Sequence, residues 1–168
     1  MTTKEESFAI RKAEPGDAGI IALHRTAMFR DMGLVSTAND FEELRAASES
    51  WLASVLAANE YVGWFVTHES DIAAGGGVLI REQFPVPGCH RVGRWAHVMN
   101  VYTEPAYRRR GLARRIMRTI LEWCEADQID RVTLSASEEG RALYESLGFH
   151  QAPEMSFRYH DRPAMKAD

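Results

Sequence analysis

The stretch VMNVYTEPAYRRRGLARRIM, from Val98 to Met117, joins three patterns that predict a strand, a tight turn and a helix. Its first part is rich in β-branched and aromatic residues and stops at Glu104-Pro105, because proline lacks the N–H that a strand ladder needs. From about Arg110 to Asp127, apolar residues recur at helical spacing. A strand that turns directly into a helix leaves the first N–H groups of the helix unpaired, at the positive end of its dipole. This junction therefore predicts a site for an anion.

The side chains around the junction favour a phosphorylated ligand. Gly111 has no Cβ and Ala113 is small, so an anion can approach the backbone closely. Arginine occupies six of the eleven positions from Arg108 to Arg118 and can reach outlying phosphates. For Arg114, Arg115 and Arg118, the alternative interpretation is a solvated helix face. The segment lacks the lysine of a P-loop and the three glycines of a dinucleotide-binding loop, so neither of those sites is predicted.

Hydrophobic patterning predicts an α/β protein around this segment. Asp17 is the expected N-cap of the first helix and Gly33 its end, and Asp40 begins a capping-box pattern for the second. Glycines 75–77 inside a strand predict a bulge or the close approach of another backbone. Strands in a meander, then a strand–helix–strand–helix–strand run, indicate a sheet packed against helices. The expected strands are 7–13, 61–68, 72–80, 94–103, 131–136 and 154–160, and the expected helices are 18–33, 40–57, 110–127 and 138–148.

Composition narrows the function classes. The 168 residues fit one domain, 1–168, with a sizeable core. The formal net charge of −4 argues against a protein that coats nucleic acid, so the arginines are a local feature of an acidic molecule. The sequence has no secretory signal or membrane-length apolar run, and Cys89 and Cys124 lack metal-ligand or C-x-x-C spacing. We expect a cytoplasmic protein with free thiols, no metal, no membrane association and no nucleic-acid partner.

Two segments resemble the GNAT superfamily of N-acetyltransferases. Arg108, Gly111 and Ala113 form R-x-x-G-x-A directly after a strand, which resembles the family's acetyl-CoA-binding motif Q/R-x-x-G-x-G/A. LYESLGF, at Leu143–Phe149, resembles its second signature, and the two helices expected between the first two strands also fit. The resemblance is specific over about Trp95–Phe149. It implies a single-domain α/β fold with a mixed, mostly antiparallel sheet of six to seven strands, about four helices, and a splayed strand pair that forms the cofactor cleft.

The resemblance also implies roles for individual residues. Backbone groups of the splayed strand would bind the pantetheine arm of acetyl-CoA, and those of the turn its diphosphate. Tyr144 matches the family tyrosine that protonates the departing CoA thiolate, a group whose solution pKa is about 8.5; a core aromatic is the alternative for this residue. Ser137 stands where the family often has Asn; it can cap the next helix and hydrogen-bond the cofactor, and a cap alone is the alternative interpretation. The cofactor-binding residues assigned in this way are Val101, Tyr102, Thr103, Arg108, Arg109, Arg110, Gly111, Leu112, Ala113, Arg114, Ser137 and Tyr144.

The sequence says less about the residues that bind and deprotonate the acceptor amine. His97, on the strand before the motif, titrates in a range useful for accepting the proton of the amine. The alternative is a histidine satisfied inside the sheet. Asn100 is a candidate for orienting a substrate or water, and His24 and Arg25 lie in the region where the family builds its acceptor pocket.

The leading hypothesis is an acetyltransferase that moves an acetyl group from acetyl-CoA to a primary amine by direct attack. The alternative is a non-catalytic acyl-CoA-binding sensor, against which the intact LYESLGF argues. Small-molecule and peptide amines both stay open as acceptors, and the acidic composition favours a cationic one. The resemblance also allows a homodimer through the C-terminal strand.

Overall fold

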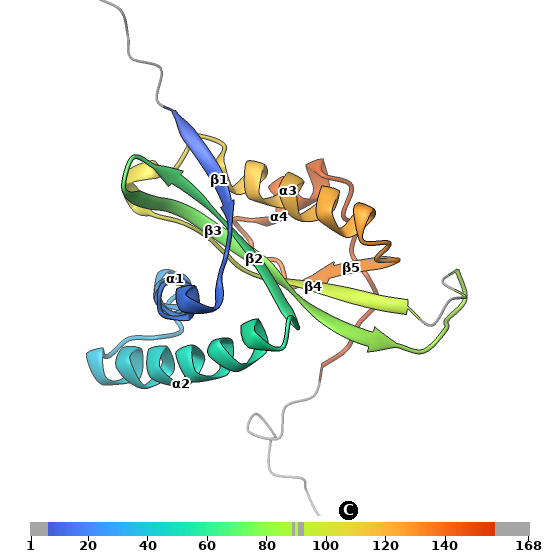
Figure 1. The fold of residues 1–168 in the computed structure, drawn as a ribbon, viewed down its shortest axis with the longest axis horizontal. Helices are drawn as coiled ribbons and strands as arrows, with labels where there is room; N and C mark the ends of the chain where they lie inside the picture. The colour runs from blue at the N-terminus through green and yellow to red at the C-terminus, as the bar shows by residue number, and fades with distance from the viewer. Residues whose placement is uncertain (1–6, 89, 91–92, 157–168) are drawn as a thin grey trace, which may run out of the picture. The chain divides into compact units, whose positions relative to one another are not determined.

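The computed structural model describes residues 7–88, 90 and 93–156, and its contacts divide the chain into two compact units, one up to Ser135 and one from Ala136. A single sheet forms the centre of the first unit (Figure 1). Its strands lie side by side in chain order: β1 (Phe8–Lys12), β2 (Tyr61–His68), β3 (Asp71–Gln83), β4 (Gly93–Thr103) and β5 (Arg131–Leu134). The first four pair antiparallel, and β5 joins β4 in parallel.

The mixed, mostly antiparallel sheet is as predicted, but it has five strands rather than six to seven in the described part of the chain. The predicted last strand is wrong where it can be compared, because Glu154–Ser156 have no regular structure. Met155 is 97% exposed, so its alternating pattern finds no apolar surface to pack against. Residues 157–160 of that prediction, and Cys89, lie outside the described residues.

Two helix layers cover the sheet of the first unit. The helices α1 (Ala18–Asp31) and α2 (Ala38–Ala57) lie on one face, and α3 (Leu112–Ala126) lies on the other (Figure 1). Short 3-10 turns, Pro15–Asp17 and Pro105–Tyr107, precede α1 and α3. The two helices between β1 and β2 confirm the predicted order of elements.

The three glycines of β3 let both layers come close to the sheet. A Cβ on Gly75 would lie 3.3 Å from His24 of α1, whereas a Cβ on Gly76 would lie 2.8 Å from Ile116 of α3. Neighbouring residues of a strand point to opposite faces, so α1 and α3 approach the sheet from opposite sides. A Cβ on Gly77 would lie 2.6 Å from the carbonyl oxygen of Val62, and the register with β4 shifts between Gly75 and Gly77. The predicted close backbone is therefore present, and the bulge at this position lies in β4, which has one residue more than β3 there.

One predicted helix cap is wrong, and the other is correct in position but makes no side-chain cap bond. The Oγ1 of Thr37 accepts the N–H of Asp40 at 3.0 Å, so the cap of α2 lies three residues before the predicted one. Asp17 precedes α1, but its carboxylate accepts two hydrogen bonds from Arg11, at 2.7 and 2.8 Å, and one from the N–H of Glu14. A guanidinium in bidentate contact binds a carboxylate more strongly than a single amide does. The predicted end of α1 is confirmed, since Gly33 follows it with a left-handed φ of +73°.

Each face has its own buried core. The α1–α2 face buries Ile21, Leu52 and Phe65, and the α3 face buries Ile116, Met117 and Ile120. Cys124 is buried in α3 and free, and burial raises the pKa of its thiol to about 11. In the described part of the chain, no helix has both the length and the apolar character of a transmembrane segment.

Candidate active site

The start of α3 presents open backbone to solvent. Gly111 is the N-cap residue, with φ +76°, and no side chain caps the helix. The first main-chain bond into the helix runs from the N–H of Arg115 to the carbonyl of Gly111, so the N–H groups of Leu112 and Ala113 have no acceptor within the helix. A Cβ on Gly111 would meet nothing within 4 Å. This geometry lets an anion reach the helix N-terminus, although α3 begins two residues later than predicted.

The turn before α3 also bends in an uncommon way. Arg109 has a left-handed φ of +64°, two residues before left-handed Gly111. Backbone that alternates between right- and left-handed conformations turns successive N–H groups towards one side, which makes an anion-binding concavity. The sequence predicted the glycine but offered no signal for the left-handed arginine.

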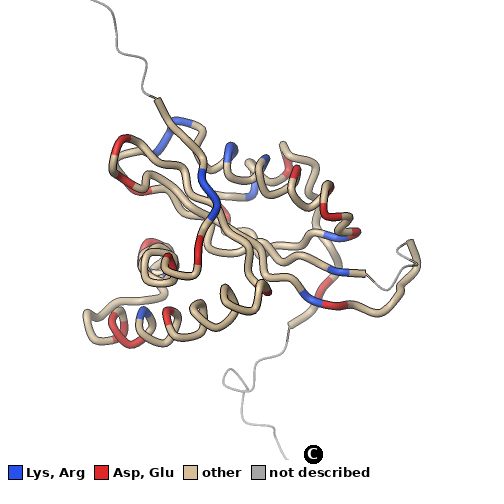
Figure 2. Tube along the Cα trace, viewed as in Figure 1, with Lys and Arg blue, Asp and Glu red and all other residues tan. Residues whose placement is uncertain are grey.

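The arginines differ in their contacts, although Figure 2 shows them gathered in the turn and along the first half of α3. Arg108 forms an ion pair with Asp31 of α1, and its Nε donates to the carbonyl of Thr103 at 3.1 Å. The hydrogen bond from Arg108 to Asp31 raises the pKa of the guanidinium. The side chain of Arg108 thus ties the turn to β4 and α1.

A hollow lies between α3 and β1. Its volume is about 420 Å³, and its lining includes Ile10, Gly111, Arg114 and Arg118. Arg115, which also lines it, donates from Nη1 to the carbonyl of Phe8 at 2.9 Å. The alternative of a purely solvated helix face therefore does not describe Arg115.

The strand β4 loses its partner before it reaches the turn. It pairs with β5 only over Trp95–Val98. Tyr102 of β4 pairs with Gly75 of β3, and the N–H of Glu104, the residue after β4, donates to the carbonyl of Ala73, so the backbone groups of both residues face β3. Strand alternation then turns the groups of Val101 and Thr103 to the other edge. At Val101 the edge of β4 has no partner strand among the described residues. Tyr102, which was also predicted to bind the pantetheine arm, uses its backbone groups to pair with β3.

A bulge in β4 places Asn100 next to this open edge. Gly76 alone lies between the paired residues of β3, while both Asn100 and Val101 lie between those of β4. Asn100 has a left-handed φ of +61°, a conformation that asparagine tolerates better than most residues. Bulges of this kind re-aim side chains and occur often beside active sites.

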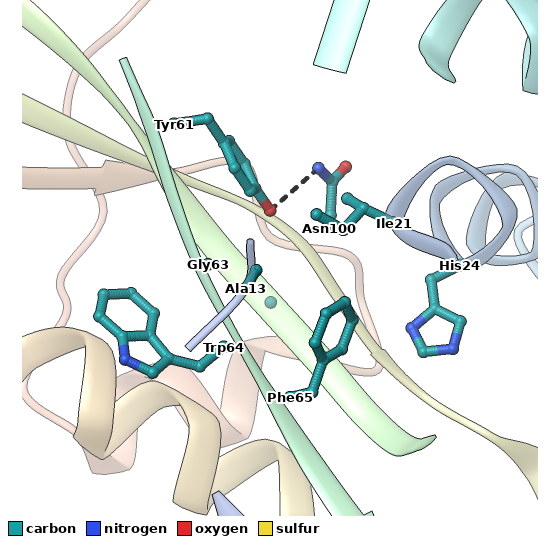
Figure 3. Close-up of a pocket in the computed structure, with 10 residues that line it drawn as sticks. Ala13, Ile21, His24, Tyr61, Gly63, Trp64, Phe65 and Asn100 are labelled. Atoms are coloured by element: carbon teal, nitrogen blue, oxygen red, sulfur yellow. Dashed lines mark hydrogen bonds between the residues drawn. The ribbon is translucent and has the colours of Figure 1, made fainter. Parts of the chain in front are cut away.

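The side chain of Asn100 is buried, and Figure 3 shows its amide beside the phenol of Tyr61. Its Oδ1 accepts from Nη1 of Arg25 at 2.8 Å, and its Nδ2 donates to the phenol oxygen of Tyr61 at 3.3 Å. Burial raises the pKa of Tyr61 to about 12, so its phenol stays neutral. Both ends of the Asn100 amide bond to groups inside the protein. Its predicted contact with a substrate or water therefore remains a prediction.

His24 lies under the end of β4 and is only 1% exposed. Its ring is 5.1 Å from that of Tyr102, and neither ring nitrogen makes a hydrogen bond within the described structure. Burial lowers the pKa of His24 to about 4. Nε2 lies 3.2 Å from Oε1 of Glu104, a proximity that favours the charged form, but the nearly complete burial dominates. His24 is therefore a neutral, buried residue that lines a small pocket with Asn100 and Tyr61 (Figure 3), and its predicted role in the acceptor site remains a prediction.

His97 lies in the paired part of β4. Its Nδ1 is 2.9 Å from Oγ1 of Thr133 in β5. One ring nitrogen is thus engaged across the sheet, as the alternative of a satisfied histidine expects.

The second unit contains α4 (Arg141–Ser146) and the tyrosine of the second signature. Tyr144 packs edge-on against Phe149 at 6.1 Å, and burial raises the pKa of its phenol. The Oγ of Ser137 accepts the N–H of Gly140 at 3.1 Å, so it stabilises the turn before α4. A Cβ on Gly140 would lie 2.9 Å from the ring of Tyr144, so the tyrosine ring packs directly over this glycine.

Comparison with known proteins identifies the family to which this chain belongs. The model of the acetyltransferase (GNAT) family matches residues 25–149. The crystal structure of a GCN5-related N-acetyltransferase from Ralstonia eutropha is similar, with 27% identity, a TM-score of 0.82, and coverage of 92% of this chain and 99% of that one. A "predicted acetyltransferase" from Clostridium acetobutylicum, crystallised with acetyl-CoA, has 24% identity and a TM-score of 0.81, with 93% and 99% covered. Glucosamine 6-phosphate N-acetyltransferase of Arabidopsis thaliana is 23% identical over 159 residues, 93% of this chain and 99% of that protein. The chain belongs to the GNAT family of acetyltransferases.

Proposed function

We propose that the protein transfers an acetyl group from acetyl-CoA to a primary amine. The supporting observation is the pair of unpaired backbone segments in the first unit, namely the edge of β4 at Val101 and the N–H groups that open α3 after Gly111. An extended amide-bearing arm can add to a strand edge, and a diphosphate suits a helix N-terminus. The η2 turn, Pro105–Tyr107, and the three residues that follow it join the two segments. Acetyl-CoA carries an amide-bearing arm followed by a diphosphate, which is the order of these two backbone segments.

The reaction that we propose is direct attack. The neutral amine nitrogen bonds to the thioester carbonyl carbon, and the carbonyl electrons move to oxygen. The N–H of Val101, at the open edge, is the proposed donor to that oxyanion. The C–S bond then breaks as the carbonyl reforms, which gives the acetamide and the CoA thiolate.

Two proton transfers complete the reaction. The amine loses one proton, for which His97 is our candidate acceptor, and the thiolate gains one. By the family resemblance, Tyr144 donates the second proton. Burial raises the pKa of its phenol, so the group holds its proton at neutral pH, as a proton donor must, but is a weaker acid than a free phenol.

Release of free thiol from acetyl-CoA tests the proposal. The purified chain is incubated with acetyl-CoA and a panel of amines that includes glucosamine 6-phosphate, glucosamine, an aminoglycoside, a polyamine and a peptide. We expect amine-dependent thiol release with at least one of them and an acetylated product of matching mass. Tight binding of acetyl-CoA in calorimetry, without turnover on any amine, would support the sensor alternative instead.

A further inference from the structure

One cation on the α1 side has no counter-charge. Arg25 is partly buried, and its Nη1 donates to Oδ1 of Asn100. Its guanidinium lies over the ring of Phe29, 4.8 Å from the centroid. Among residues 7–88, 90 and 93–156, no carboxylate forms an ion pair with it. Burial lowers its pKa, and only the phenol of Tyr61 opposes this effect.

Four other described arginines pair with carboxylates, whereas Arg30, which also lies on α1 and forms no ion pair with a described residue, is exposed to water. Arg11 pairs with a carboxylate in the turn before α1, Arg45 pairs within α2, and Arg94 and Arg108 pair with aspartates far along the chain. A cation removed from water costs free energy unless an anion or hydrogen bonds compensate it. Arg25 is partly buried and has no anion beside it among the described residues, so a negative group from outside the chain would stabilise it.

The position of Arg25 relates it to the acceptor. Asn100, which it holds, immediately precedes Val101, the proposed oxyanion donor. Figure 3 shows Asn100 beside α1, on the side of the sheet that carries Ile21 and His24. The proposed diphosphate contact, at the start of α3, belongs to the opposite face. The donor and the acceptor therefore reach the edge of β4 from opposite faces, and Arg25 lies on the acceptor's side.

We propose that Arg25 binds an anionic group, a carboxylate or a phosphate, on the acceptor, so the substrate is an amine that also carries a negative charge. This inference rests on the proposed acetyl transfer. A guanidinium has five N–H donors, and one of them is used by Asn100. Asn100 and Phe29 hold the group in place, which leaves it ready for a two-pronged contact with an anion. This local charge overrides the expectation of a cationic acceptor from overall composition.

Matched pairs of amines test the assignment. Glucosamine 6-phosphate is compared with glucosamine for the phosphate, and alanine with alaninamide for the carboxylate. For each pair, kcat/KM and the calorimetric Kd are measured with the wild type, Arg25→Gln, Arg25→Lys and the control Arg45→Gln. Arg25→Gln keeps an amide donor for Asn100 but removes the charge. The quantity of interest is the ratio of anionic to neutral substrate in each variant, which removes differences in amine basicity.

We expect the wild type to prefer one anionic member by at least about tenfold, as one charge-assisted hydrogen bond implies. Arg25→Gln should abolish that preference mainly through KM and Kd, Arg25→Lys should keep part of it, and Arg45→Gln should leave it unchanged. An equal loss on the anionic and neutral members would show that Arg25 only supports Asn100 and would overturn the inference. So would a wild type without any anionic preference. If no amine is acetylated, the proposed function fails, and the Kd ratio still decides whether Arg25 binds an anion.

Discussion

Replacement of Gly111 with alanine separates the cost of backbone strain from the loss of cofactor binding. Gly111 has φ +76°, and a Cβ there would meet nothing within 4 Å. Alanine in this left-handed conformation costs roughly 1–2 kcal/mol of stability, with no added clash. For a chain of this size, each kcal/mol lowers the melting temperature by about 2–4 °C. The same Cβ would occupy the space through which a diphosphate reaches the N–H groups of α3. Loss of one charge-assisted hydrogen bond there weakens acetyl-CoA binding by about tenfold to hundredfold.

The chain supplies a matched control for this variant. Gly33 has φ +73°, and a Cβ on it also meets nothing within 4 Å, but it lies at the end of α1. Gly33→Ala and Gly111→Ala should therefore lose similar melting temperature in calorimetric scans. Only Gly111→Ala should bind acetyl-CoA more weakly in isothermal titration. Equal affinity in the two variants would refute the assignment of the diphosphate to the start of α3.

Three further outcomes are expected. Tyr144→Phe should keep the Kd for acetyl-CoA and lower kcat about a hundredfold, as loss of a general acid does; an unchanged kcat contradicts its role. His24 takes up a proton below about pH 6.5 when unfolded but only below about 4 when folded, so stability falls as pH drops through this window. In urea titrations, the free energy of unfolding of the wild type should fall by roughly 2 kcal/mol between pH 7 and pH 5 because of His24, and that of His24→Gln should lack this contribution. Parallel curves of unfolding free energy against pH for the two proteins would argue against a neutral His24. Asn100→Ala should lower the unfolding free energy by about 2–4 kcal/mol, because it strains the left-handed position and leaves Tyr61 and Arg25 without a partner. Asn100→Gly should lose less in the same titration, and equal losses would show that backbone strain does not matter at the bulge.

The strand–turn–helix segment could be predicted because its signals are local. Pro105 ends the strand, Gly111 marks the helix start, and apolar spacing defines the inner face of α3. The extra strand at 154–160 was wrong where it can be compared, since an alternating pattern describes what a strand looks like but supplies no surface for it. The cap of α2 moved to Thr37 because Thr37 and Asp40 satisfy a capping pattern as well as Asp40 and Glu43 do.

The network around Asn100 could not be predicted for a different reason. Asn100 meets Arg25 from 75 positions away and Tyr61 from 39, and Arg108 meets Asp31 from 77. No spacing rule covers such distances. The left-handed φ of Asn100 likewise depends on the pairing of β3 with β4, which a pattern within one strand does not specify. Sequence reasoning selected Asn100 and Arg25 for the region in which they lie, and the contact between them emerged only from the fold.

The glycine run of β3 has a consequence for mutational scanning. In a saturation library selected for activity, every replacement at Gly75, Gly76 and Gly77 should be depleted as severely as replacements of reacting groups, although these residues carry no chemistry. Even a methyl group would push against Phe65, Ile116 or Tyr61. Intolerance in this stretch therefore measures how closely α1, α3 and the neighbouring strand must approach β3. If positions were ranked only by their tolerance of substitution, these three glycines would be mistaken for catalytic residues.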